Sequence, residues 1–170
     1  MKKILFLLAL LLLSLGAAEA QKIALVDMEY ILKKDPSYAV MNRQIEDLSK
    51  KWQAEVAGYE KKAEQAYQSY QSEAALLSAQ QKKQREESIV ALEKQAYELK
   101  RKYFGPEGEL FKKRESLMKP IQDRVWAAMK ELARRGGLQL IIDRSSSKIV
   151  YADPGLDISE AVVSTLGLDR

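Results

Sequence analysis

Residues 51–100 read KWQAEVAGYEKKAEQAYQSYQSEAALLSAQQKKQREESIVALEKQAYELK. On both sides of Ser78, apolar or aromatic side chains recur every three or four positions, which is the period of an α-helix. The first series is Tyr38, Met41, Ile45, Leu48, Trp52, Val56, Tyr59, Ala63, Ala66, Tyr70, Ala74 and Leu77, and the second is Ile89, Leu92, Ala96, Leu99 and Tyr103. Seams this narrow are typical of coiled coils, so we predict two long helices joined near residue 78.

The local residues at the turn support a hairpin. Ser78 is followed three residues later by Gln81, which is the spacing of a capping box that begins a helix. Pro36 and Pro120 lie at equal distances before and after Ser78, and proline suits the first turn of a helix. We therefore expect an arm over residues 37–119, with its tip near residue 78 and the two prolines where the arm meets the remainder. The Gly105-Pro106-Glu107-Gly108 segment should interrupt the returning limb.

The two ends of the chain, residues 21–36 and 120–170, are expected to form a small β-sheet body. Branched apolar residues predict three short strands, at Lys22–Asp27, Leu138–Ile142 and Lys148–Tyr151. Gly136 and Gly137 should end the returning helix, and Asp157 or Ser159 should cap a closing helix. The predicted fold class is thus α+β, a three-stranded body that carries a long antiparallel coiled-coil hairpin.

A sheet this small leaves open edges and uncovered apolar surface, so we expect the body to self-associate. The candidate contact residues are the apolar strand residues Ile23, Leu25, Leu140, Ile142 and Ile149.

The first twenty residues have the form of a secretory signal peptide. Lys2 and Lys3 precede an apolar run that is too short to cross a bilayer, and Ala18-Glu19-Ala20 supplies a cleavage site of the A-x-A kind. We expect cleavage after Ala20 and export of the remaining chain, with an uncleaved amino-terminal anchor as the alternative.

The composition excludes several chemistries. The chain has no histidine and no cysteine, so it lacks the residues for Ser-His or Cys-His catalysis and for soft metal ligation. No phosphate-binding glycine loop occurs, which argues against a nucleotide-driven cycle. Asp27 and Asp143 are interpreted as a helix cap and a turn residue. We expect no enzyme activity, no catalytic residue, no cofactor and no metal.

The arm surface offers candidates for binding another molecule. They are paired lysines and tyrosines: Lys50, Lys51, Tyr59, Lys61, Lys62, Tyr67, Tyr70, Lys82 and Lys83. Lysines can attract acidic partners or anionic lipid heads, and outward tyrosines suit adaptable apolar contacts. The same side chains would also serve as a solvated helix face or as seam packing, and both readings remain open.

The end segments resemble the Skp/OmpH family of periplasmic chaperones. The residues that carry the likeness are IALVDMEYIL at 23–32 and LQLIIDRSSSKIVYADPGLDISEAVVSTLG at 138–167, on either side of the polar helical insert. The resemblance implies a periplasmic homotrimer in which strands of each subunit form a central β-barrel. It further implies three arms that enclose unfolded outer-membrane β-barrel proteins.

The residues and the resemblance together predict an ATP-independent holding chaperone that prevents aggregation of unfolded outer-membrane proteins through many weak contacts. A structural or adaptor coiled-coil protein of the cell envelope is the alternative, and an outward-facing heptad would favour it. Binding to an anionic lipid surface is a further alternative. Nucleic acid is not expected, because the net charge of +4 is spread among many acidic residues.

Overall fold

The computed structural model describes residues 22–169 and contains two compact units. One unit comprises residues 22–31 and 126–169, and the other comprises residues 32–125. The expected signal peptide lies outside the described residues. In chain order the elements are β1 (Ile23–Val26), α2 (Met28–Lys34), α3 (Pro36–Glu73), α4 (Ala79–Phe104), α5 (Glu109–Gly136), β2 (Leu140–Asp143), the 3-10 turn η1 (Pro154–Leu156) and α6 (Ser159–Thr165).

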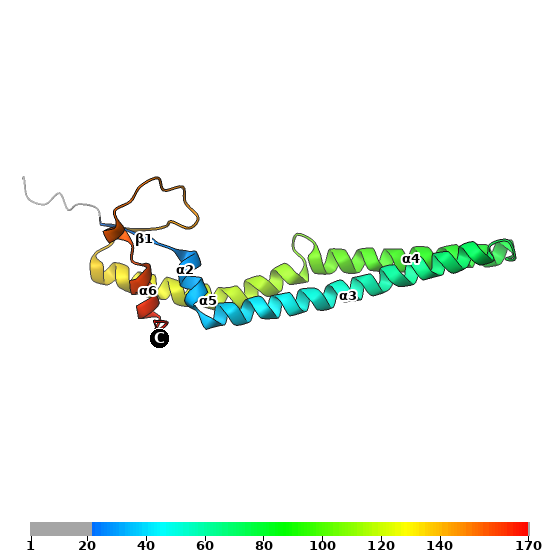
Figure 1. The fold of residues 1–170 in the computed structure, drawn as a ribbon, viewed down its shortest axis with the longest axis horizontal. Helices are drawn as coiled ribbons and strands as arrows, with labels where there is room; N and C mark the ends of the chain where they lie inside the picture. Colours follow the sequence, from blue (N-terminus) through cyan, green and yellow to red (C-terminus); the bar gives the residue numbers. More distant parts are fainter. Residues whose placement is uncertain (1–21, 170) are drawn as a thin grey trace, which may run out of the picture. The chain divides into compact units, whose positions relative to one another are not determined.

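The predicted helical hairpin is confirmed, with α3 and α4 lying side by side in opposite directions (Figure 1). Asp35 caps α3 by accepting a hydrogen bond from the Ser37 backbone N–H, and Pro36 occupies the first turn. Ser78 caps α4 in the predicted capping box, in which the Gln81 side chain accepts a hydrogen bond from the Ser78 N–H. Local polar residues thus fix both the start of the hairpin and its turn.

The predicted seam contributes most of the core of this unit. Its buried members are Met41, Ile45, Val56, Ala63, Ile89, Ala96 and Tyr103, and Ile121 and Val125 of α5 are buried as well. Trp52 of α3 stacks on Tyr103 of α4, with ring centroids 4.5 Å apart and planes 2° from parallel. Near the base of the arm, Met41, Ile45 and Ile121 form one apolar cluster, so the first turns of α5 continue the seam of α4. Burial of this stripe is what holds two otherwise polar helices together.

The returning limb is interrupted where the sequence predicts it, between Phe104 and Glu109. A Cβ at Gly105 would lie 2.4 Å from the carbonyl oxygen of Arg101, so this sharp exit from α4 requires glycine. Pro120, which the sequence analysis takes as a marker of where the arm meets the remainder, lies inside α5, and the helix continues through it to Gly136. Burial of the neighbouring Ile121 in the cluster with Met41 keeps the helix intact despite the one lost backbone hydrogen bond.

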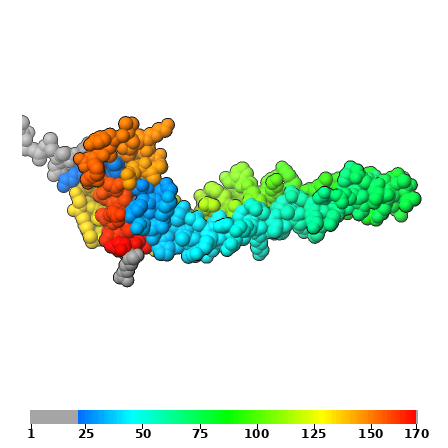
Figure 2. Space-filling model, viewed as in Figure 1, coloured from blue at the N-terminus to red at the C-terminus, as the bar shows by residue number. Residues whose placement is uncertain are grey.

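The body contains a two-stranded parallel sheet in which Ile23 pairs with Leu140 and Val26 with Asp143. The predicted first and second strands are confirmed with shifted ends. The third predicted strand, over residues 148–151, does not form in the single chain. This segment is instead a loop at the surface (Figure 2). A strand needs a neighbouring strand for its backbone groups, and no segment of residues 22–169 pairs with this one.

The end of α5 follows the predicted glycine signal. Gly136 is the last helical residue, and Gly137 takes a φ of 62°, which an L side chain rarely adopts. The N–H of Leu138 then donates to the carbonyl of Ala133 at 2.9 Å, which closes the helix in a Schellman arrangement. This tight reversal delivers the chain into β2.

Candidate functional site

A groove of about 390 Å³ lies between α3 and α4 on the arm. Its lining residues are Glu60, Ala63, Glu64 and Tyr67 from α3, and Glu93, Ala96, Tyr97 and Lys100 from α4. The two alanines are buried seam residues, and their short side chains leave the space above them unfilled. Tyr67 is 49% exposed and Tyr97 is 66% exposed, so both rings are accessible from solvent. The groove combines an apolar floor with aromatic and charged walls.

The charges of this groove are predominantly negative, with three glutamates and one lysine. Glu60 and Glu93 form no ion pair within residues 22–169, and Glu64 accepts a hydrogen bond from the Gln68 amide at 3.2 Å. The Tyr67 hydroxyl accepts one from the Gln71 amide at 2.9 Å. The carboxylates therefore remain available to a cation from outside.

The predicted arm lysines differ in their surroundings. Lys50 pairs with Glu46 at 2.6 Å, and Lys83 pairs with Glu87 at 3.9 Å, in both cases one helical turn apart. The hydrogen bond from Lys50 lowers the pKa of Glu46, and the same bond raises the pKa of Lys50. These two lysines are thus partly neutralised by their own helix.

The remaining predicted lysines have fewer partners. Lys62 lies over the ring of Tyr59, 4.9 Å from its centroid. Lys51, Lys61 and Lys82 form no ion pair within the described part of the chain. Lys51 and Lys61 are exposed, and Lys82 is half-buried. The structure does not gather the basic candidates into one patch: Lys50 and Lys51 lie early in α3, whereas Lys82 and Lys83 lie just after the turn.

The predicted tyrosines divide between packing and exposure. Tyr59 and Tyr70 are half-buried, and the Tyr70 hydroxyl donates to Glu86 across the hairpin. That hydrogen bond is the main cause of the raised pKa of Tyr70. Tyr67 alone among the three is exposed and lines the groove.

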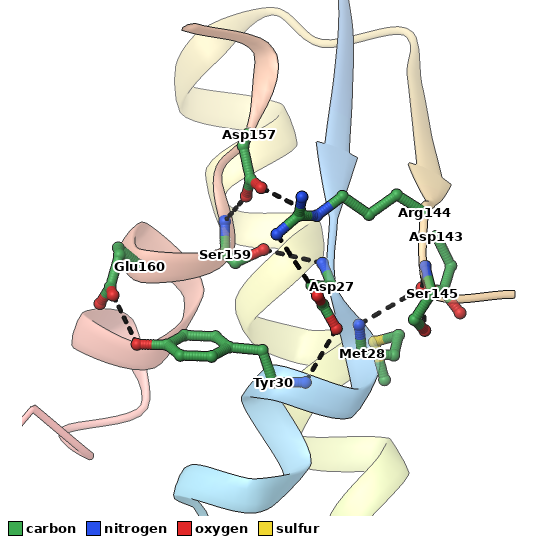
Figure 3. Close-up of polar contacts among 9 residues, drawn as sticks. All are labelled: Asp27, Met28, Tyr30, Asp143, Arg144, Ser145, Asp157, Ser159 and Glu160. Atoms are coloured by element: carbon green, nitrogen blue, oxygen red, sulfur yellow. Dashed lines mark hydrogen bonds and ion pairs between the residues drawn. The ribbon is translucent and has the colours of Figure 1, made fainter. Parts of the chain in front are cut away.

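In the body, Arg144 connects three segments that are distant in sequence (Figure 3). Its guanidinium lies 3.3 Å from Asp27, after β1, and 3.0 Å from Asp157, just before α6. Ser159 adds a further tie, because its hydroxyl accepts a 2.7 Å hydrogen bond from the Asp27 N–H. The arrangement fixes the ends of the sheet to the closing helix.

Two aspartates of this cluster accept hydrogen bonds at the starts of helices. Asp27 accepts from the Tyr30 N–H at the start of α2, as expected of a cap. The N-cap position of α6 is Ile158, which makes no side-chain cap, and Asp157 before it accepts from the Ser159 N–H. Burial alone would raise the pKa of Asp157, but the hydrogen bonds from Ser159 and the charge of Arg144 hold that pKa below its usual value. Burial likewise opposes the low pKa of Asp143, which hydrogen bonds from Ser145 maintain.

Four of the five predicted self-association residues keep accessible surface. Leu140 is 49% exposed and Ile149 is 37% exposed, while Ile23 and Ile142 are half-buried. Leu25 is buried within the chain itself. Val150 and Tyr151, which the sequence placed in a strand, are 101% and 84% exposed. Both side chains therefore lie open to solvent on the loop at residues 148–151.

Sequence reasoning missed most of the groove. It named Tyr67 but not Tyr97, Lys100 or the glutamates, because these residues are ordinary on a helix surface. A usable signal was present, since Ala63 lies 15 residues before Ser78, Ala96 lies 18 residues after it, and both replace larger side chains in the seam. Pairing the two small residues across the turn would have indicated a gap.

Residues 22–169 lack two other kinds of feature. No group of three or more metal-ligating acidic, histidine or cysteine side chains is present there. No helix in that range has both the length and the apolar character to span a bilayer.

Comparison with known proteins gives relatives in one family. The chaperone protein Skp of Yersinia enterocolitica is 25% identical over 158 residues, which cover 92% of each chain. A crystal structure from Caulobacter crescentus CB15, described as a candidate OmpH-like outer membrane chaperone, matches with a TM-score of 0.70 and 11% identity, over 88% of this chain and 86% of that one. The model of the family described as outer membrane protein (OmpH-like) matches residues 22–166. The chain belongs to this OmpH-like family.

Proposed function

We propose that the protein is an ATP-independent holding chaperone that binds unfolded outer-membrane β-barrel proteins and prevents their aggregation. Membership of the OmpH-like family and similarity to a chaperone named Skp support this role. The fold is consistent with it, because a long two-helix arm presents a large surface without an enclosed reaction site. The proposal includes a periplasmic location for the mature chain, and the signal-peptide pattern at residues 1–20, with its expected cleavage site after Ala20, supports that location.

The main support for the proposal is that the arm has two sets of apolar side chains, one buried in the seam and one exposed to solvent. The seam residues are buried between α3 and α4, so the hairpin is complete without a partner helix. Large apolar side chains nevertheless stay exposed outside the seam: Val40, Tyr67, Val90, Tyr97 and Phe111. They are scattered among charges, which suits many weak, sequence-tolerant contacts with an extended chain.

Three copies would supply the multivalency that weak contacts require. The two-stranded sheet is marginal by itself, and the exposed loop at residues 148–151 offers Ile149, Val150 and Tyr151 to a neighbouring copy. A trimer with a central β-barrel would cover this surface and provide the predicted third strand with a partner. Several arms around one client raise the effective concentration of each contact.

The test is aggregation of a denatured outer-membrane β-barrel protein after dilution, followed by light scattering. We expect the mature protein to suppress scattering at one trimer per client, without added nucleotide. Unchanged scattering at a molar excess of the mature protein would reject the holding role.

The exposed apolar residues also separate this role from the alternatives. An adaptor that docks onto another coiled coil needs a continuous outward heptad, and Val90 with Tyr97 make only one such repeat on α4. Binding to anionic lipid would depend on the arm lysines, several of which are paired with glutamates. Sedimentation with anionic vesicles at low and moderate salt measures that contribution separately.

A further inference from the structure

The groove between α3 and α4 has a charge opposite to that of the arm around it. Residues 37–119 contain more lysine and arginine than aspartate and glutamate, and the whole chain has a net charge of +4. Within the groove, Glu60, Glu64 and Glu93 outnumber Lys100. A negative hollow on a positive arm would repel the acidic partners that the remaining lysines attract.

The carboxylates stand beside accessible aromatic rings. Tyr67 lies one helical turn from Glu64, and Tyr97 lies one turn from Glu93, all four lining the same groove. Tyrosine faces attract cations and also pack against the aliphatic stem of a long side chain. The combination therefore matches a side chain that is both cationic and largely apolar.

We propose that this groove binds arginine and lysine side chains of unfolded polypeptides, with the cation at the glutamates and the stem on Tyr67 and Tyr97. This inference rests on the proposed holding function and deepens it by naming a client-binding site and the client chemistry. Arginine fits better than lysine, because its planar guanidinium stacks on tyrosine and pairs with carboxylates through several donors.

A metal ion fits the groove poorly. The described residues hold no group of three potential metal ligands close enough to share one ion, so the carboxylates act on a cation spread over a longer side chain. The groove volume of about 390 Å³ is in the range of sites that take a sizeable organic group. An open groove on a two-helix arm also lets the rest of an extended chain continue past both ends.

The experiment measures binding of short, unstructured, fluorescently labelled peptides to the full mature protein by anisotropy. The peptides share tyrosine and serine positions and differ only in carrying arginine, glutamine or glutamate at the remaining positions. The wild-type protein should bind the arginine peptide most tightly and the glutamate peptide least.

The groove variant is Glu60→Gln with Glu64→Gln and Glu93→Gln. It should bind the arginine peptide about five- to tenfold more weakly, because exposed ion pairs are individually weak but three carboxylates are lost. Its affinity for the glutamine peptide should stay within about twofold of wild type. If the wild-type protein bound the arginine peptide no more tightly than the glutamine peptide, the proposal would be overturned.

A matched control has the same change of charge outside the groove, as Glu46→Gln with Glu87→Gln and Glu98→Gln. These carboxylates pair with lysines of their own helices. The control should bind the arginine peptide within about twofold of wild type. If both triple variants weakened binding of the arginine peptide equally, the effect would come from net charge, and the proposed role of the groove would be wrong. Circular dichroism verifies that both keep their helical content.

The double variant Tyr67→Ala with Tyr97→Ala tests the apolar half of the site. It should weaken binding of the arginine peptide about threefold or more, since both rings are accessible and neither belongs to the buried seam. The aggregation assay separates the two proposals. Suppressed aggregation without arginine preference rejects the groove alone, whereas arginine preference without suppression rejects the holding role alone.

Discussion

Replacement of Asp35 by alanine should destabilise the start of the arm. Asp35 is only 3% exposed and makes two kinds of contact. One carboxylate oxygen accepts from the Ser37 N–H at 2.8 Å and caps α3, and the other lies 2.6 Å from the Arg124 guanidinium on α5. Arg124 also donates to the Ser37 hydroxyl at 3.2 Å. One aspartate therefore fixes the first turn of α3 against the returning helix.

The two contacts allow a magnitude to be worked out. Loss of a helix cap costs about 1 kcal/mol. The charged hydrogen bond to Arg124 adds about 1 kcal/mol and no more, because the arginine side chain is 52% exposed and regains water when its partner is removed. Asp35→Ala should thus lower the free energy of unfolding by about 2 kcal/mol. Asp35→Asn keeps the capping oxygen and should cost about 1 kcal/mol.

The assay is urea unfolding of the mature protein, followed by far-ultraviolet circular dichroism. All variants are compared at one protein concentration, since association of subunits would add to the measured stability. The reasoning would be refuted if Asp35→Ala stayed within about 0.5 kcal/mol of wild type. If Asp35→Asn were as costly as Asp35→Ala, the cap would contribute nothing and the assignment of that contact would be wrong.

Two glycines of the arm should respond oppositely to alanine, and the body should respond to acid. Gly105→Ala should cost about 1–3 kcal/mol, because the new Cβ meets the Arg101 carbonyl oxygen at 2.4 Å. Gly58→Ala should gain about 0.5–1 kcal/mol, because Gly58 lies inside α3 with no atom near a new Cβ. Urea midpoints check both, and equal effects would contradict the geometry. The pKa values of Asp143 and Asp157 are lower in the folded protein than in the unfolded chain. Their contribution is complete above the unfolded value of about 3.9 and is lost as the pH falls below it, so thermal stability should drop below about pH 4. An acid-insensitive melting temperature between pH 5 and 3 would contradict this.

The sequence predicts the hairpin well because its determinants are local. The capping box at Ser78 needs only residues three positions apart, and the helical seam repeats over many turns. Pro120 lies inside α5, and Ile121 beside it is buried in the cluster with Met41 and Ile45. A proline signal alone does not show whether a helix begins at that residue or continues through it.

The third strand and the groove were beyond sequence reasoning for different reasons. Residues 148–151 have the composition of a strand, but no segment of residues 22–169 pairs with them, and composition alone does not show whether a segment finds a pairing partner. The groove depends on which helix faces meet, so Tyr97 and Glu93 became informative only once α3 and α4 were placed together. Their types and spacing on one helix are those of a solvated surface.

The central claim, that the arms hold unfolded clients, is tested most directly by photo-crosslinking from the arm surface. A photoreactive benzoylphenylalanine replaces Val90 or Tyr97, which are 60% and 66% exposed on α4, in the full mature protein. After mixing with a denatured outer-membrane β-barrel protein and illumination, adducts are resolved by gel electrophoresis and mass spectrometry. We predict client adducts at both positions, decreasing as the client folds into detergent micelles. Absence of adducts at both positions, while aggregation is still suppressed, would contradict binding by the arms.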